Sequence, residues 1–363
     1  MTDTPPTGTT PPTGTEPRTL DQALAAIAAA SCAADVLGAD PAAATRRYRR
    51  LVRLLHPDTV PSSRRAEAEA ACAALNALRD RATARAAAEP ELTTRHHHYS
   101  VGPVLAVGDI AVLRRARSRP LDGGKPHRAV LKIPRSPADN DLMAREATAL
   151  DRLARHGDPR FRPYVPTLLE SFLHTDSDPA DPARTVRRIN ALRRLDGFHP
   201  LTDLLAAWPQ GLDPRDAGWI WRRLLVALGH AHRAGVRHGS VLPEHVLVHL
   251  GEHGLVLVDW CHSVTGDHVP LPALVERYRD RYPPEVAARR PATEATDIHL
   301  ATRCMAELIG PRAPRELRAF IDGCTLPSER ARPHDAWRLL AELDALLEHL
   351  YGPRTFRPLH LPT

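Results

Sequence analysis

Polar residues that could perform chemistry gather in and after the segment Arg237–Val248, RHGSVLPEHVLV. Ser240 and His245 lie within it, and Asp259 follows the next apolar run, GLVLVD. A neutral imidazole suits transition metals as a ligand, whereas Mg²⁺ prefers oxygen ligands. The Ser240 hydroxyl carries no charge at neutral pH and is a poor general base.

Lysine is almost absent from the chain. Of 49 basic residues only Lys125 and Lys132 are lysine, which leaves 49 − 2 = 47 arginines. A compact ammonium reaches phosphates as a point charge in a way that a forked guanidinium does not. Lys132, in the strand-like run HRAVLKIP, is therefore a candidate for a position where chemistry requires lysine.

Composition places the chain among globular proteins and excludes several classes. It has 363 residues, of which 43% are hydrophobic and 25% charged, with a net charge of +6. Basic residues are scattered among acidic ones without stacking aromatics, so we expect no nucleic-acid partner. Apolar runs are too short for a bilayer span and no signal peptide is evident, so we expect no membrane partner. The five cysteines are odd in number and lack C-x-x-C spacing, which favours reduced thiols and the cytoplasm.

The order of segments predicts an α+β protein with two folded modules. Residues 1–17 are rich in Pro, Thr and Gly and should be disordered. Residues 18–88 are helical in character, and residues 89–98, which contain the run RHHH, are predicted to be a solvated linker rather than a metal site. Strand-like segments followed by helices fill residues 99–350, which indicates a small sheet lobe and a helical lobe. Residues 351–363 form a C-terminal tail.

The first module contains an amphipathic helix. Tyr48, Leu51 and Leu55 recur at helical spacing, so they should share one buried face. Arginines then occupy the opposite face. The helix should end at His56, because Pro57 restricts the residue before it and cannot continue the hydrogen-bond ladder.

The segment DVLGADPAAATRRYRRLVRLLHPD, followed by AALNALRD, resembles a J-domain. The resemblance implies that a DnaK-type chaperone binds the His-Pro-Asp tripeptide and the basic helix, through His56, Pro57, Asp58, Arg47 and Arg50. Arg79 departs from the family, which usually has an aromatic residue there, so packing should differ. No Gly/Phe-rich segment or zinc-binding cysteine repeat follows, which argues against a full chaperone of the DnaJ type.

The segment from residue 99 onward resembles the N-lobe of a protein kinase. The AVLK motif implies that Lys132 grips nucleotide phosphates and that Glu146, in REATAL, is its partner. The glycine loop is poor, because Gly108 is flanked by alanines where the family has glycines. The resemblance places adenine against the backbone near Asn190 and Leu192.

The C-terminal half resembles a kinase C-lobe, with HGSVLPEH for the catalytic loop and DWC for D-F-G. Ser240 stands at the position of the catalytic Asp, and His245 and Asp259 stand at the metal-binding positions. The resemblance therefore implies that His245 with Asp259 binds a metal, Mn²⁺ or Zn²⁺ in view of the imidazole. The alternative is that His245 hydrogen-bonds Asp259 or packs beneath the loop. Gly239 replaces the Arg that would anchor a phosphorylated activation loop. Four further residues are given structural roles: His238 packs in the loop, Glu285 pairs with Arg332, and Asp297 holds the loop backbone.

These resemblances imply a J-domain co-chaperone with a degenerate pseudokinase that binds ATP with Mg²⁺ or Mn²⁺ and senses nucleotide or docks a client protein. The first alternative is an active atypical serine/threonine kinase that takes its general base from elsewhere, His262 being one candidate. The second is a scaffold in which neither module binds its usual ligand. The sequence names no client.

Overall fold

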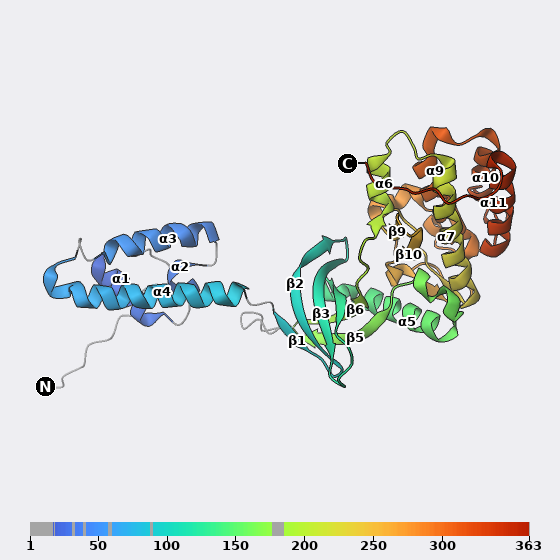
Figure 1. The fold of residues 1–363 in the computed structure, drawn as a ribbon. Coiled ribbons are helices and arrows are strands. Elements are labelled where there is room, and N and C mark those ends of the chain that lie inside the picture. The colour runs from blue at the N-terminus through green and yellow to red at the C-terminus, as the bar shows by residue number, and fades with distance from the viewer. Residues whose placement is uncertain are drawn as a thin grey trace. The chain divides into compact units, whose positions relative to one another are not determined.

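The computed structural model describes residues 17, 19–30, 33–38, 41–56, 60–87, 90–175 and 185–362. Contacts divide the chain into two compact units, residues 1–90 and residues 91–363 (Figure 1). Each unit has its own hydrophobic core. Within the described ranges, none of the helices has both the length and the apolar character that crossing a bilayer requires.

The N-terminal unit is helical. Its α-helices are α1 (Leu20–Ala29), α2 (Ala33–Leu37), α3 (Pro41–Leu54) and α4 (Arg65–Ala87). Thr19 caps α1 by accepting a hydrogen bond from the Gln22 amide, which satisfies one of the free donors of the first turn. Leu51 and Leu55 are buried as predicted, and Leu75 of α4 packs in the same core.

Arg79 occupies the position where the J-domain resemblance expects an aromatic residue. Its guanidinium carbon lies 4.3 Å from the centre of the Tyr48 ring, and the Tyr48 hydroxyl donates to Asn76 Oδ1 at 2.8 Å. A cation–π contact and a hydrogen bond therefore join α3 to α4 at this point. Pro57 and Asp58 lie outside the described residues, and the assignment of this unit as a J-domain stays a prediction.

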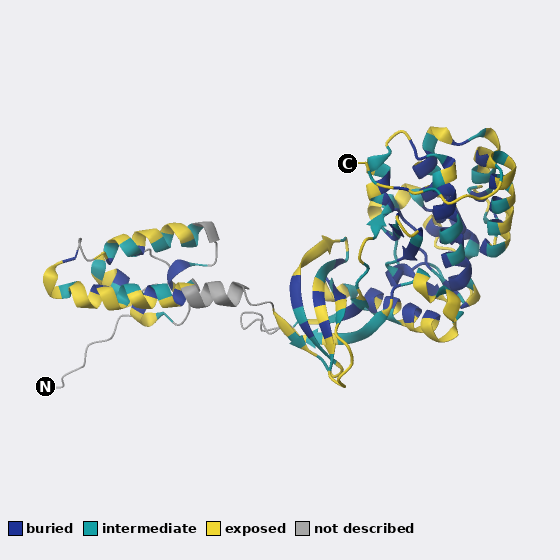
Figure 2. Ribbon diagram, viewed as in Figure 1, coloured by how far each residue is buried: buried dark blue, intermediate teal, exposed yellow. Residues whose placement is uncertain are grey.

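The C-terminal unit begins with a six-stranded antiparallel sheet in the order β1-β2-β3-β4-β6-β5. The strands are β1 (Glu91–Thr93), β2 (His97–Val107), β3 (Ala111–Pro120), β4 (His127–Pro134), β5 (Leu168–Thr175) and β6 (Val186–Arg193). The helix α5 (Asn140–His156) packs beside β5 and β6. Figure 2 shows buried and exposed residues alternating along these strands, as a sheet with one covered face requires.

The predicted linker at residues 89–98 differs from the structure. Residues 91–93 form β1, which pairs with β2 so that Leu92 lies opposite Tyr99. His97 and His98 belong to β2, and the His98 ring lies 2.9 Å from the Thr93 hydroxyl. The polar composition of residues 89–98 indicated a solvated linker. The sheet nevertheless extends into this segment, because β1 and β2 form backbone hydrogen bonds and Tyr99 is fully buried.

The rest of the unit is mainly helical and surrounds α7 (Pro214–Arg233), most of which is buried (Figure 2). The other α-helices are α6 (Leu201–Ala207), α8 (Pro284–Ala287), α9 (Glu294–Ile309), α10 (Arg315–Cys324) and α11 (Ala336–Tyr351). Short strands form two small sheets: β7 (His199–Pro200) and β10 (Gly254–Leu257) flank β9 (Val246–His249), and β8 (Val236–Arg237) pairs with β11 (Val264–Thr265). These sheets place the loop at residues 238–245 next to Asp259.

The C-terminal segment packs on the helical part although it has no regular structure. The Arg357 guanidinium donates to Asp216 at 3.1 Å, and His253 Nε2 lies 3.0 Å from the Arg357 carbonyl. The His253 ring stacks between Trp219 and Phe356. The predicted tail therefore belongs to the folded unit as far as residue 362.

Candidate functional site

A cavity of about 480 Å³ lies between the sheet and the helical part of the C-terminal unit. The turn between β2 and β3 lines it with Gly108 and Asp109, β4 with Val130 and Lys132, and the end of β6 with Leu192. The loop at residues 238–245 and the residues after β10 line the opposite side. The residues predicted to hold a nucleotide and a metal thus come from segments more than a hundred residues apart.

Strand periodicity brings Lys132 to the cavity. In β4, Ala129 and Leu131 belong to the core under the sheet, whereas Val130 and Lys132 line the cavity. Side chains two residues apart lie on one face of a strand, so this alternation follows directly from the HRAVLKIP pattern. Glu146 reaches Lys132 from α5, where it lies on the buried stripe with Met143.

Lys132 is held by three acceptors. Its Nζ lies 3.0 Å from Glu146 Oε1, 3.0 Å from Asp259 Oδ1 and 3.1 Å from Cys261 Sγ. Burial by itself would lower the pKa of Lys132, but the attraction of the carboxylates Asp259 and Glu146 outweighs it and raises the pKa well above its usual value. Burial would likewise raise the pKa of Asp259, and Lys132 instead holds it well below its usual value.

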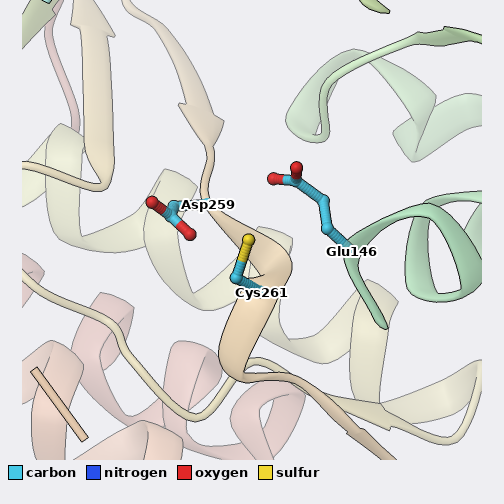
Figure 3. Close-up of side chains that lie close together, drawn as sticks. All are labelled: Glu146, Asp259 and Cys261. Atoms are coloured by element: carbon cyan, nitrogen blue, oxygen red, sulfur yellow. The ribbon is translucent and has the colours of Figure 1, made fainter. Parts of the chain in front are cut away.

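Glu146, Asp259 and Cys261 could also be considered as metal ligands, because their ligand atoms lie within 4.8 Å of one another (Figure 3). The Lys132 ammonium donates to Glu146 and Cys261 and forms an ion pair with Asp259, and so occupies the position that an ion would take. Burial also raises the pKa of the Cys261 thiol well above its usual value, and a protonated thiol is a poor ligand. The cluster is therefore better explained as the binding site of the Lys132 ammonium.

Asn190 does not line the cavity, although it was predicted to lie against a nucleotide. It is fully buried in β6, and its side-chain amide donates to Glu146 Oε2 and to the Met143 carbonyl, both at 2.9 Å. Its role is to fix Glu146. Leu192, two residues further along the strand, does line the cavity, and the chain continues along it to Leu195.

The backbone amide of Gly108 is engaged in a hydrogen bond within the protein. It donates to the Ala111 carbonyl at 2.9 Å and closes the turn between β2 and β3. Gly108 therefore contributes to the shape of the cavity, and its own N–H is engaged within the turn rather than directed at a phosphate.

Ser240 is fully buried and does not line the cavity. Its hydroxyl lies 3.4 Å from His245 Nδ1, and its carbonyl accepts a hydrogen bond from the same nitrogen at 2.7 Å. That bond directs His245 Nε2 toward Asp259 Oδ2, 3.6 Å away, and Glu244 Oε1, 3.5 Å away. An imidazole nitrogen and carboxylates are ligand types that Mn²⁺ or Zn²⁺ accepts, although among the described residues the group whose ligand atoms converge within 4.8 Å is Glu146, Asp259 and Cys261.

The loop backbone is positioned by Asp297 of α9, as the sequence predicted. Its buried carboxylate accepts hydrogen bonds from the amides of His238 and Gly239, both at 2.8 Å. Gly239 has a φ of +77°, and an added Cβ would lie 2.7 Å from the His262 carbonyl. A larger residue would therefore be strained at this position in the present loop conformation.

His238 and the pair formed by Glu285 and Arg332 are buried outside the cavity. The His238 ring packs edge-on against Trp260, with ring centres 4.5 Å apart. Arg332 donates to Glu285 at 2.6 Å, and both side chains are fully buried. These residues stabilise the fold around the loop.

His262 lines the cavity and was considered as an alternative base. Burial is the main cause that lowers its pKa to about 4, so the ring is neutral at pH 7 and a weak proton acceptor. Its Nδ1 is buried without a hydrogen-bond partner.

The sequence analysis assigns no role to Arg237, Glu244 or Arg277, although Glu244 lies in the segment that resembles the catalytic loop. Arg237 donates to the Gly266 carbonyl and to Asp267, both at 2.9 Å, and thereby holds the segment after β11. Glu244 and Arg277 both line the cavity and bond each other. Their pairing joins segments more than thirty residues apart, and no local pattern in the sequence indicates it.

Comparison with known proteins agrees with a kinase-like unit. The sequence model of the lipopolysaccharide kinase (Kdo/WaaP) family matches residues 184–265. No curated protein matches the chain. A solved structure titled "Structure of vaccinia related kinase 3" is similar over 76% of this chain and 95% of its own, with a TM-score of 0.55 and 15% sequence identity. A likeness at this identity establishes the fold, and the chain therefore contains a protein-kinase-like domain.

Proposed function

We propose that the kinase-like unit is a pseudokinase that binds ATP together with Mg²⁺ or Mn²⁺ and transfers phosphate poorly. The observation that carries the proposal is the arrangement of Lys132, Glu146 and Asp259 at the base of the cavity. The Lys132 ammonium supplies positive charge for phosphate, Glu146 holds that ammonium in place, and Asn190 in turn fixes Glu146. A bound metal ion would neutralise phosphate charge, with Asp259 and His245 as its ligands.

Weak transfer follows from the loop that carries Ser240. A positioned general base contributes roughly 10²- to 10⁴-fold to such reactions. Ser240 has no carboxylate and its side chain is buried outside the cavity, while His262 is a weak base. The residues that bind are retained and the residue that would accept the substrate proton is absent.

Binding of ATP should raise the unfolding temperature of the wild-type protein by several degrees in the presence of Mg²⁺ or Mn²⁺. A ligand at 100 times its dissociation constant stabilises the folded state by about 2.7 kcal/mol. The shift should vanish in Lys132→Ala, each variant being compared with its own midpoint without ligand. Lys125→Ala replaces the second, exposed lysine and should keep the full shift. A shift of equal size in Lys132→Ala would overturn the proposed site.

We further propose that the N-terminal unit is a J-domain that recruits a DnaK-type chaperone, with an unidentified protein client docked on the kinase-like unit. The support is the HPD tripeptide at residues 56–58 and the arginine-rich α3, in which Arg50 is exposed. His56 is exposed at the end of that helix. Nucleotide binding in the second unit would then report on the state of the client complex.

The full-length protein should stimulate the ATPase of a purified DnaK-type chaperone, and His56→Gln should abolish the stimulation. The physical reason is that an exposed histidine at the end of α3 is accessible to a partner protein. His96→Gln changes an exposed histidine of the other unit and should leave stimulation intact. Equal stimulation by wild type and His56→Gln would refute the J-domain assignment.

A second candidate function is that of an active, atypical kinase. It is favoured by the match of residues 184–265, which include Ser240, to a family of kinases, and by Glu244, a cavity-lining carboxylate on the same loop. Transfer of labelled phosphate from ATP by the purified wild-type protein, abolished in Glu244→Gln, would favour this candidate over the first.

A further inference from the structure

Arg277 lies at the outer part of the cavity and contacts both of its sides. It belongs to the 3₁₀ segment η5 (Glu276–Arg281) that follows β11. Its guanidinium bonds Glu244 of the loop and lies 3.9 Å from Asp109 Oδ2 in the turn between β2 and β3. Half of the Arg277 side chain is exposed, compared with 4% for Lys132, so Arg277 is much nearer to solvent.

The other basic groups of the cavity are placed differently. Lys132 is deep and already faces the two carboxylates Glu146 and Asp259. Arg193 and Arg194 come from the end of β6, and Arg194 pairs with Asp196 at 2.9 Å. Among the described lining residues, Arg277 is the basic group that faces both the β2–β3 turn and the loop at residues 238–245.

The present partners of Arg277 can be exchanged. The contact with Asp109 is long, and both side chains are about half exposed, so solvent screens the attraction. A phosphate group offers a guanidinium two parallel charge-assisted hydrogen bonds and carries more negative charge than a carboxylate. A polyphosphate whose inner part lies near Lys132 would extend outward toward this guanidinium.

We infer that Arg277 is a phosphate-binding residue that gives this cavity its preference for nucleoside triphosphates, and that it exchanges Asp109 and Glu244 for the terminal phosphate. The inference rests on the proposed nucleotide site and adds a specificity-determining residue to it. Arg277 would also link the segment after β11 to the ligand.

The test is isothermal titration calorimetry of the full-length protein with ATP, ADP and AMP in excess Mg²⁺. The variant Arg277→Gln lacks a charged hydrogen-bond partner for the terminal phosphate. Its affinity for ATP should be about tenfold to hundredfold lower than that of wild type, and its affinity for AMP should change less than about twofold. Arg277→Lys keeps the positive charge but lacks the paired N–H donors of a guanidinium. Its affinity for ATP should lie between those of wild type and Arg277→Gln. Arg279→Gln, an exposed arginine of the same segment paired with Glu276, should behave as wild type.

Each outcome decides a different point. The inference is supported if Arg277→Gln loses the discrimination between ATP and AMP while wild type and Arg279→Gln keep it. Nucleotide binding with the same ATP-to-AMP ratio in wild type and Arg277→Gln overturns the role of Arg277 and leaves the proposed site intact. Absence of binding by every nucleotide to the wild-type protein overturns the proposed site, and the inference with it.

Discussion

The free energy of unfolding of the kinase-like unit should fall by about 6 kcal/mol when the pH is lowered from 7.5 to 5. Burial is the main cause that lowers the pKa of His238, His262 and His299 to about 4 each. In the unfolded chain a histidine has a pKa of about 6.5. Between these values the unfolded chain binds protons that the folded unit excludes, so stability is complete above pH 6.5 and decreases toward pH 4.

Each histidine contributes about 2 kcal/mol of this loss at pH 5. The reason is that pH 5 lies about 1.5 units below the pKa of an unfolded histidine, and one unit corresponds to about 1.4 kcal/mol. Urea unfolding followed by tryptophan fluorescence measures it, since all five tryptophans lie in the kinase-like unit. His299→Gln should remove about a third of the pH dependence. His334→Gln, at an exposed histidine, should leave it unchanged. A free energy of unfolding that is constant from pH 7.5 to 5 would contradict the prediction.

Arg332→Leu should lower the free energy of unfolding of the same unit by about 3–5 kcal/mol at pH 7.5. Arg332 and Glu285 are both fully buried, so the substitution leaves a buried carboxylate whose remaining side-chain partner is the hydroxyl of Thr296. A surface ion pair behaves differently, because both of its partners are hydrated when separated. The measurement is again urea unfolding followed by tryptophan fluorescence.

The matched control is Arg338→Leu, which removes an arginine that is 81% exposed and pairs with Glu342 one turn away. Its effect should stay within about 0.5 kcal/mol. Glu285→Gln combined with Arg332→Leu should recover part of the loss, because the remaining side chain is then neutral. If Arg332→Leu cost no more than Arg338→Leu, the buried pair would not stabilise this unit.

The parts of the site that the sequence predicted are those set by local periodicity. Alternation in β4 brings Lys132 to the cavity, and helical spacing in α5 brings Glu146 to the buried face, so their pairing follows once the two elements pack. Asp259 is the second residue after β10, and its position follows from the end of that strand. The kinase-like fold itself followed from the order of such motifs along the chain.

The residues that were misplaced depend on contacts that no local pattern records. Asn190 lies on the same face of the sheet as its strand partner Lys132, but its amide is engaged by Met143 and Glu146 of α5 rather than by a ligand. Ser240 turns inward because His245, five residues later, hydrogen-bonds its carbonyl. The strand β1 forms because β2 offers an edge with which it can pair. Each of these depends on a neighbour that the sequence alone does not identify.

The contacts of Arg237 with Gly266 and Asp267 have a consequence for how this unit is controlled. Many enzymes of this fold order the corresponding segment only after a phosphate has been attached to it. Here an unmodified arginine, also paired with Glu294 at 2.8 Å, already supplies the tether. The segment after β11 is therefore held in place by side chains of this unit itself, without a phosphate group attached to it.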